Sequence, residues 1–109
     1  MATSEEIQSI FPEMVKRLIP EKAEGVNVVI QFDLSGDNGG LYWVKVVDGT
    51  AENGNGSIDN PSMTLKSTAD DWFAVSTGQL NAMQAFMSGK IKIQGDMGIA
   101  MKMQTMFAT

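Results

Sequence analysis

The sequence contains no histidine and no cysteine. Without imidazole, one chain cannot build the serine–histidine triads or the histidine-ligated zinc centres of hydrolases and deaminases. Without thiols it has no disulfide, no thiolate metal site and no redox motif. An enzyme made from this chain would have to rely on carboxylates, lysine, hydroxyl groups or a bound cofactor.

Basic residues are also few, with eight lysines and arginines against 13 aspartates and glutamates and a formal net charge of −5. Because the eight cations are scattered, the sequence does not offer the clustered charge that neutralises phosphates, and nucleic acid is excluded as an expected partner. Purely electrostatic attachment to an anionic membrane is disfavoured for the same reason.

Long hydrophobic runs are missing as well. No run approaches the roughly 20 residues that span a bilayer, and the first six residues are polar and acidic rather than typical of a signal peptide. The last three residues carry no lipidation or peroxisomal signal. We therefore expect a cytoplasmic protein without stable membrane insertion, folded as a single domain over residues 1–109.

Hydrophobic periodicity predicts an α+β fold with a mainly antiparallel sheet. Alternation over 26–34 points Phe32 inward, and the glycine-rich turn at 36–40 leads to a partner strand with Val44 inward. Each strand keeps a polar face, so helices should cover only the other face. The predicted strands are 26–34, 41–47, a weak edge strand at 50–57, 62–67 and 90–94; the predicted helices are 3–19, 68–77, 82–88 and one from 96.

Capping patterns mark the helix starts. Thr3 and Glu6 fit a capping box, and Thr68 with Asp71 opens the second helix. Pro12 should kink the first helix or split it in two, and Pro20 should end it.

The polar motifs give no strong catalytic or metal signal. The 53–57 stretch NGNGS lacks the spacing and lysine of a phosphate loop, and the acidic residues of 48–59 lack the glycine and glutamate of a calcium loop. Asp70 and Asp71 diverge by about 100° on a helix, so they favour capping over acid–base chemistry. Lys90 and Lys92 share the outer face of one strand and are weak candidates for an anionic headgroup; a solvated face is the alternative.

Methionine is abundant, with nine residues. Met83 and Met87 are four apart on one predicted helix, and Met97 and Met101 are four apart on the last. That last helix is apolar around most of its circumference, so it needs cover on more than one side. A homodimer partner, a loop or a ligand would supply this cover, and flexible thioether chains suit an irregular apolar site.

These residues also resemble the sterol carrier protein 2 family, over nearly the whole chain and most densely over 77–101. Such proteins have a similar first hairpin around 29–34 and 48–49. The most specific stretches are Thr77-Gly78-x-Leu80-Asn81, Ala85-Phe86, Gly89-Lys90-Ile91-Lys92-Ile93 and Gly95-Asp96-Met97-Gly98-Ile99-Ala100-Met101-Lys102.

The resemblance implies a five-stranded, mainly antiparallel sheet, helices on one face, and an apolar tunnel between them. Such a tunnel binds sterol, fatty acid, fatty acyl-CoA or phospholipid, and the family carries lipid rather than catalysing a reaction, without a cofactor or metal. Because peroxisomal members end in a targeting tripeptide, this chain resembles a free-standing prokaryotic-type member, for which fatty acid or acyl-CoA is the expected ligand.

Two hypotheses follow. The first is a non-catalytic lipid-binding or lipid-transfer module; the second is a structural or protein-interaction module, dimerising or accessory to a lipid-metabolising enzyme, with no free cavity. For the first, strand parity and helix faces predict a tunnel lined by Phe32, Val44, Phe73, Met83, Phe86, Met87, Ile93, Met97, Met101 and Phe107.

Overall fold

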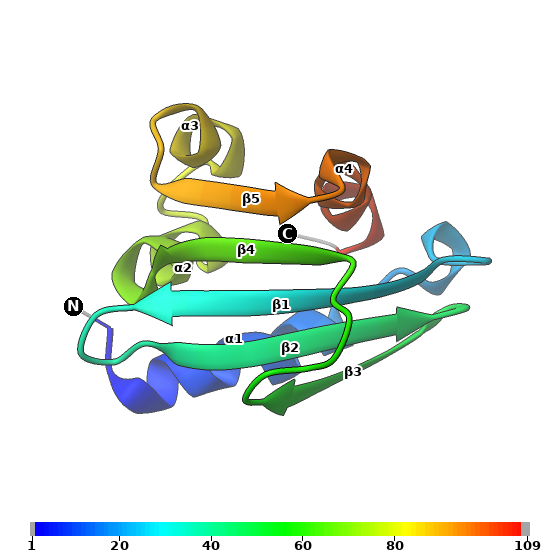
Figure 1. The fold of residues 1–109 in the computed structure, drawn as a ribbon, viewed down its shortest axis with the longest axis horizontal. Helices are drawn as coiled ribbons and strands as arrows, with labels where there is room; N and C mark the ends of the chain where they lie inside the picture. Colours follow the sequence, from blue (N-terminus) through cyan, green and yellow to red (C-terminus); the bar gives the residue numbers. More distant parts are fainter. Residues whose placement is uncertain (1, 108–109) are drawn as a thin grey trace.

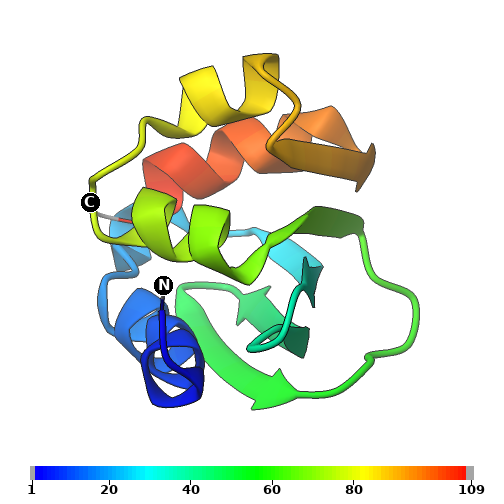
Figure 2. The same cartoon turned by 90° about the vertical axis from the view of Figure 1, so that its left-hand side faces the viewer.

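The computed structural model describes residues 2–107, which form a five-stranded sheet with helices on one face (Figures 1 and 2). The strand order is β3-β2-β1-β4-β5. Only the central β1–β4 pair is parallel among these neighbours. The α+β prediction with a mainly antiparallel sheet is confirmed. The elements are α1 (Ser4–Lys16), the 3-10 helix η1 (Pro20–Lys22), β1 (Asn27–Ser35), β2 (Gly40–Val47), β3 (Thr50–Asn55), β4 (Met63–Thr68), α2 (Ala69–Ser76), α3 (Ala82–Met87), β5 (Ile91–Gly95) and α4 (Met97–Met106).

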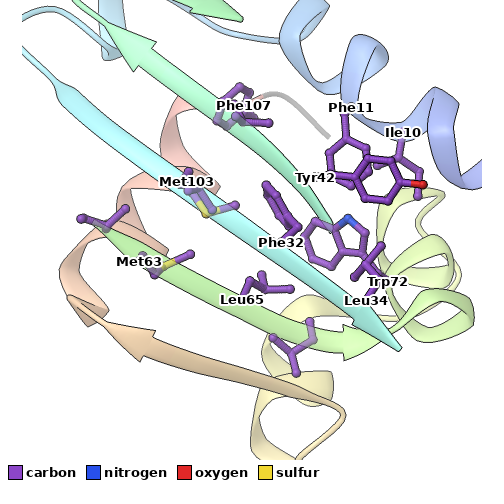
Figure 3. Close-up of a cluster of buried hydrophobic side chains, with 14 of the residues drawn as sticks. Ile10, Phe11, Phe32, Leu34, Tyr42, Met63, Leu65, Trp72, Met103 and Phe107 are labelled. Atoms are coloured by element: carbon purple, nitrogen blue, oxygen red, sulfur yellow. The ribbon is translucent and has the colours of Figure 1, made fainter. Parts of the chain in front are cut away.

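Aromatic side chains fill the core between α1, α2 and the first strands (Figure 3). Alternation along β1 and β2 sends their apolar residues to the helical face, as predicted. Phe11 of α1 stacks on Tyr42 at 4.5 Å and lies 5.0 Å from Phe32, between ring centroids. The ring centroid of Trp72 of α2 lies 5.4 Å from that of Phe32. This half of the sheet is therefore tightly covered.

Side-chain caps begin each α-helix. Thr3 and Glu6 form the predicted capping box on α1, and Thr68, Asn81 and Asp96 each accept a backbone N–H of the helix that follows. Each cap satisfies a donor that the first helical turn leaves free.

The prediction that Pro12 kinks or splits the first helix is wrong in its second form, because α1 is continuous from Ser4 to Lys16. A proline removes one backbone hydrogen bond. The buried residues Ile7, Ile10 and Phe11 anchor the helix before Pro12, and Met14 packs against the same core after it.

The connection between β3 and β4 crosses the outer face of the sheet (Figure 1). Gln31 of β1 holds it there. Its side-chain Nε2 donates to the carbonyl oxygens of Tyr42 at 2.8 Å and Gly56 at 3.1 Å, and its Oε1 accepts from the amide of Ile58 at 2.8 Å. Gln31 is buried although it points away from the helices, because the crossing strap covers it.

Replacing Gln31 with leucine should destabilise the fold by about 1–3 kcal/mol, because it leaves buried backbone groups without hydrogen-bond partners. The measurement is urea-induced unfolding followed by tryptophan fluorescence. Gln94→Leu is the matched control, since Gln94 lies exposed on the edge strand β5 and its loss should change stability by less than about 0.5 kcal/mol. Equal losses in the two variants would contradict the role assigned to Gln31.

Candidate functional site

A cavity of about 280 Å³ lies at the β4–β5 end of the sheet, beneath α3 and α4. The inward residues of β4 and β5 form its floor, α3 and α4 form two walls, and Trp72 of α2 closes the inner end. Its lining residues are Leu65, Trp72, Ala82, Met83, Phe86, Ile91, Ile93, Met97, Ala100, Met101, Met103 and Gln104.

The position of the cavity follows from how the helices are tethered. α3 spans only six residues, too few to cover two strands. α4 is attached at its far end, where the amide of Ile19 donates to the carbonyl of Met106 at 2.7 Å and Leu18 forms a β-bridge with Phe107. Beneath the other end of α4, the small side chain of Ala100 leaves space above β5. The helical layer therefore closes over the first three strands and stays open over the last two.

The chemistry of the cavity is apolar. Eleven of its twelve lining residues are apolar, and Gln104 is the exception. Within residues 2–107, no three acidic side chains are grouped so that they could hold a metal ion, and no helix is long and apolar enough to cross a membrane. An engineered apolar cavity of roughly 150 Å³ already binds benzene, so this space can hold part of a hydrocarbon chain.

Four of the apolar lining residues are also exposed, and they form the mouth of the cavity. The exposed fractions are 51% for Met83, 39% for Phe86, 46% for Met97 and 71% for Met101. A contiguous patch of exposed apolar side chains marks an interaction site or a ligand-binding groove. Because three of the four are methionines, the mouth can change shape at little cost in free energy.

A second hollow of about 130 Å³ adjoins the cavity. It shares Trp72, Ala82, Met103 and Gln104 with the cavity, and it extends between α1 and α2 to Arg17. Arg17 is the single arginine of the sequence. The two hollows together offer an apolar space with a cation at one end.

Trp72 stands where the cavity, the second hollow and the core meet. Its indole is 7% exposed, and its Nε1 has no hydrogen-bond partner among the described residues. A buried indole usually finds such a partner. Trp72 therefore contributes through packing, since its ring lies against Phe32 and also lines the cavity.

Five of the ten predicted lining residues come together around the cavity: Met83, Phe86, Ile93, Met97 and Met101. The other five lie elsewhere. Phe32 and Val44 point inward as predicted, but they are fully buried under α1 and α2 in the core rather than facing an open space. Phe73 is half-buried on α2, and Met87 is 78% exposed on α3. Phe107 is buried beside the second hollow.

Lys90 and Lys92 lie outside the cavity. They line a shallow depression on the outer face of the sheet with Asp33 and Lys66. The strand alternation that placed them on the outer face is therefore correct. Their predicted headgroup role remains a prediction, and the sheet stands between them and the cavity floor.

The sequence prediction missed seven lining residues. Leu65 and Ile91 have the same inward parity as Ile93, so alternation alone could have found them. Ala82 and Ala100 line the cavity because they are small, which periodicity does not report. The seven are Leu65, Trp72, Ala82, Ile91, Ala100, Met103 and Gln104.

Comparison with known proteins identifies relatives of this domain. The family model described as the SCP-2 sterol transfer family matches residues 11–108. Hydroxysteroid dehydrogenase-like protein 2 of Danio rerio is 31% identical over 94% of this chain and 25% of its own length. Sterol carrier protein 2 of Rattus norvegicus is 35% identical over 89% of this chain and 19% of its own. The chain thus spans about a quarter or less of these two relatives.

The fold has a solved counterpart of the same size. Sterol carrier protein 2 from Aedes aegypti, determined in complex with the C16 fatty acid palmitate, superposes with a TM-score of 0.69 at 21% identity. The match covers 96% of this chain and 94% of the mosquito protein. At this identity the likeness establishes the fold, including the mixed sheet with helices on one face.

Removing the same side-chain atoms from a packed and from an open position should test the cavity. Ile30→Ala should cost toward the upper part of the 2–5 kcal/mol range for such core substitutions, because Ile30 is fully buried. Ile93→Ala should cost less than about 2 kcal/mol, since Ile93 already borders empty space. Denaturant unfolding of both variants measures the difference. Equal costs would mean that the cavity is closed in solution.

Proposed function

Because the chain belongs to the SCP-2 sterol transfer family, we propose that it binds and transfers an apolar lipid in the cavity between α3, α4 and the β4–β5 strands. The observation that carries this proposal is the cavity itself, which is apolar, open to the surface and walled by adaptable methionines. A packed helical layer with no space beneath it would have favoured the structural module instead.

A fatty acyl chain is the ligand that the cavity suits best, as free fatty acid or fatty acyl-CoA. Palmitate bound to the mosquito protein of the same fold supports this class. Each buried methylene contributes about 0.8 kcal/mol, so eight buried methylenes would supply about 6 kcal/mol toward binding. Sterol and phospholipid are bulkier and would require α3 and α4 to move further apart.

The role we propose for this domain is non-catalytic. The cavity walls bring no carboxylate, lysine or hydroxyl group together that could act on a bound acyl chain. Several relatives are longer proteins named as dehydrogenase-like, so a domain of this kind can accompany an enzyme. We propose that in such a setting it presents lipid to a separate catalytic domain.

The polar end of the ligand has two candidate cation sets. Arg17 lies at the end of the second hollow, which shares four lining residues with the cavity. Lys90 and Lys92, the residues predicted from the sequence, lie on the opposite face of the sheet. We therefore propose Arg17 as the partner of a carboxylate, with the acyl chain passing Trp72 into the main cavity.

Filling the cavity should weaken binding without unfolding the protein. Ala100→Phe places an aromatic ring in the open space, and we expect the affinity for a fluorescent fatty acid to fall at least about tenfold, which corresponds to roughly 1.4 kcal/mol. Fluorescence titration of delipidated protein measures this. Gln84→Phe is the control, because Gln84 is exposed on α3 and does not line the cavity. No saturable binding by the unmodified protein would refute the proposed function.

The position of the carboxylate can be tested separately. Arg17→Gln should weaken binding of a fatty acid by about twofold to fivefold, since Arg17 is exposed and an exposed ion pair contributes up to roughly 1 kcal/mol. Binding of the corresponding neutral methyl ester should not change. The double variant Lys90→Gln with Lys92→Gln is the comparison. If the lysine double variant loses affinity for the acid but not for the ester, and Arg17→Gln loses neither, the headgroup lies on the outer face, as predicted from the sequence.

A further inference from the structure

Four methionine side chains are exposed on the helices that wall the cavity. Met83 and Met87 lie four positions apart on α3, and Met97 and Met101 lie four positions apart on α4. Their exposed fractions range from 46% for Met97 to 78% for Met87. Small oxidants such as hydrogen peroxide can therefore reach these thioether side chains from solution.

Other sulfur-containing side chains are shielded or missing. Met63, Met103 and Met106 are buried, and Met14 is only partly exposed. The chain has no cysteine, and a cysteine thiolate is the group that would otherwise compete for a peroxide. Among the described residues, the sulfur-containing side chains most open to an oxidant are therefore the four methionines of α3 and α4.

Three of these four exposed methionines also line the cavity, namely Met83, Met97 and Met101. Met87 does not line it, although it is the most exposed of the four. Among the described residues that line the cavity, Gln104 carries the one polar side chain. An oxygen atom added to a lining sulfur would therefore enter surroundings that are almost entirely apolar.

The oxidation of a thioether by a hydroperoxide is a single two-electron step. The sulfur attacks the terminal peroxide oxygen, so that a sulfur–oxygen bond forms and the oxygen–oxygen bond breaks. The proton of that terminal oxygen moves to the leaving oxygen, which departs as water from hydrogen peroxide or as an alcohol from an organic hydroperoxide. The methionine is oxidised to a sulfoxide while the peroxide is reduced, and methionine sulfoxide reductases reverse the change.

We propose that Met83, Met97 and Met101 form a modification site for hydroperoxides, and that their oxidation to sulfoxides releases the bound lipid. This inference rests on the proposed lipid-binding function. In the empty protein, a sulfoxide at the exposed mouth keeps its hydrogen bonds to water, so oxidation changes the free state little. A bound acyl chain excludes that water and leaves the sulfoxide oxygen buried without a donor, which is unfavourable. Oxidation therefore acts against the lipid-bound state alone.

The test compares lipid affinity before and after mild treatment of the delipidated full chain with hydrogen peroxide. Fluorescence titration with a fatty acid measures the affinity, and peptide mass spectrometry with fragmentation assigns each sulfoxide. We expect sulfoxides at the four exposed methionines, with Met63 and Met106 unmodified. The affinity should fall by at least about fivefold, the effect of burying one polar group without a partner.

Two variants separate the lining methionines from mere exposure, each compared with itself before and after peroxide. In the triple variant Met83→Leu with Met97→Leu and Met101→Leu, leucine keeps a similar volume and offers no sulfur to oxidise, so the affinity should not fall on treatment. Met87→Leu is the matched control, because Met87 is exposed but does not line the cavity. Its affinity should fall as in the unmodified chain. Met101→Leu alone should lose part of the fall, and it serves as the second variant if the triple variant does not fold.

The source of the hydroperoxide is distinguished by two reagents. Met101 and Met87 have similar exposed fractions, 71% and 78%, so hydrogen peroxide should oxidise them at similar rates. A fatty acid hydroperoxide that enters the cavity is held beside Met101 and not beside Met87, which should favour oxidation of Met101. A higher ratio of Met101 to Met87 sulfoxide with the fatty acid hydroperoxide assigns the oxidant to the bound ligand, and equal ratios assign it to solution.

Several results would overturn the inference. Saturable lipid binding that oxidation leaves unchanged would overturn it while the proposed function stands, and the methionines would then serve only as adaptable packing. A fall in affinity that persists in the triple variant, or that Met87→Leu prevents, would also overturn it. So would loss of the far-ultraviolet circular dichroism spectrum on oxidation, because unfolding would then explain the lost affinity. No saturable binding before treatment would refute the proposed function and this inference together.

Discussion

The structure depends on one constraint: the helices do not fully cover the apolar face of the five-stranded sheet. α1 and α2 pack the aromatic residues Phe11, Tyr42, Phe32 and Trp72 into a closed core over the first strands. The remaining strands, β4 and β5, are covered by the six-residue helix α3 and by α4, whose C-terminal end is held by the hydrogen bond from Ile19 to Met106. A sheet face must be covered to be stable, yet here the cover is incomplete. The cavity is the space that results from this difference.

Most of the fold could be predicted because local signals agreed with the global arrangement. Alternation in β1 and β2, the capping residues Thr3 and Thr68, and the turn glycines all acted within a few residues of one another, and each is confirmed. Pro12 is the exception, because packing of the neighbouring buried residues outweighed a local rule. The parallel β1–β4 pairing has no local signal, since it joins strands some thirty residues apart.

The candidate site was harder to predict for a physical reason. The alternation of side chains along a strand predicts which face of the sheet a residue takes, but it does not predict which helix lies above that residue. Phe32 and Ile93 have the same parity and belong to one row across the sheet, Phe32 beside Leu65 and Leu65 beside Ile93. Phe32 is covered completely by the helices, whereas Ile93 faces the cavity, so Phe32 belongs to the core and Ile93 to the cavity wall. Helices α3 and α4 were predicted better, because an apolar face that finds no packing partner is visible in the sequence itself.

The strap from β3 to β4, held by Gln31, divides the molecule in a way that matters for its evolution. The segment before the strap builds most of the filled half of the sheet, and the segment after it, from Met63 to Phe107, supplies every residue that lines the main cavity. A sequence change in that C-terminal segment can therefore alter the size or lining of the main cavity without disturbing the aromatic cluster at the other end, apart from Trp72. The lining of the main cavity and the aromatic cluster are therefore encoded in largely separate stretches of the chain, so one scaffold can vary its cavity while it keeps its fold.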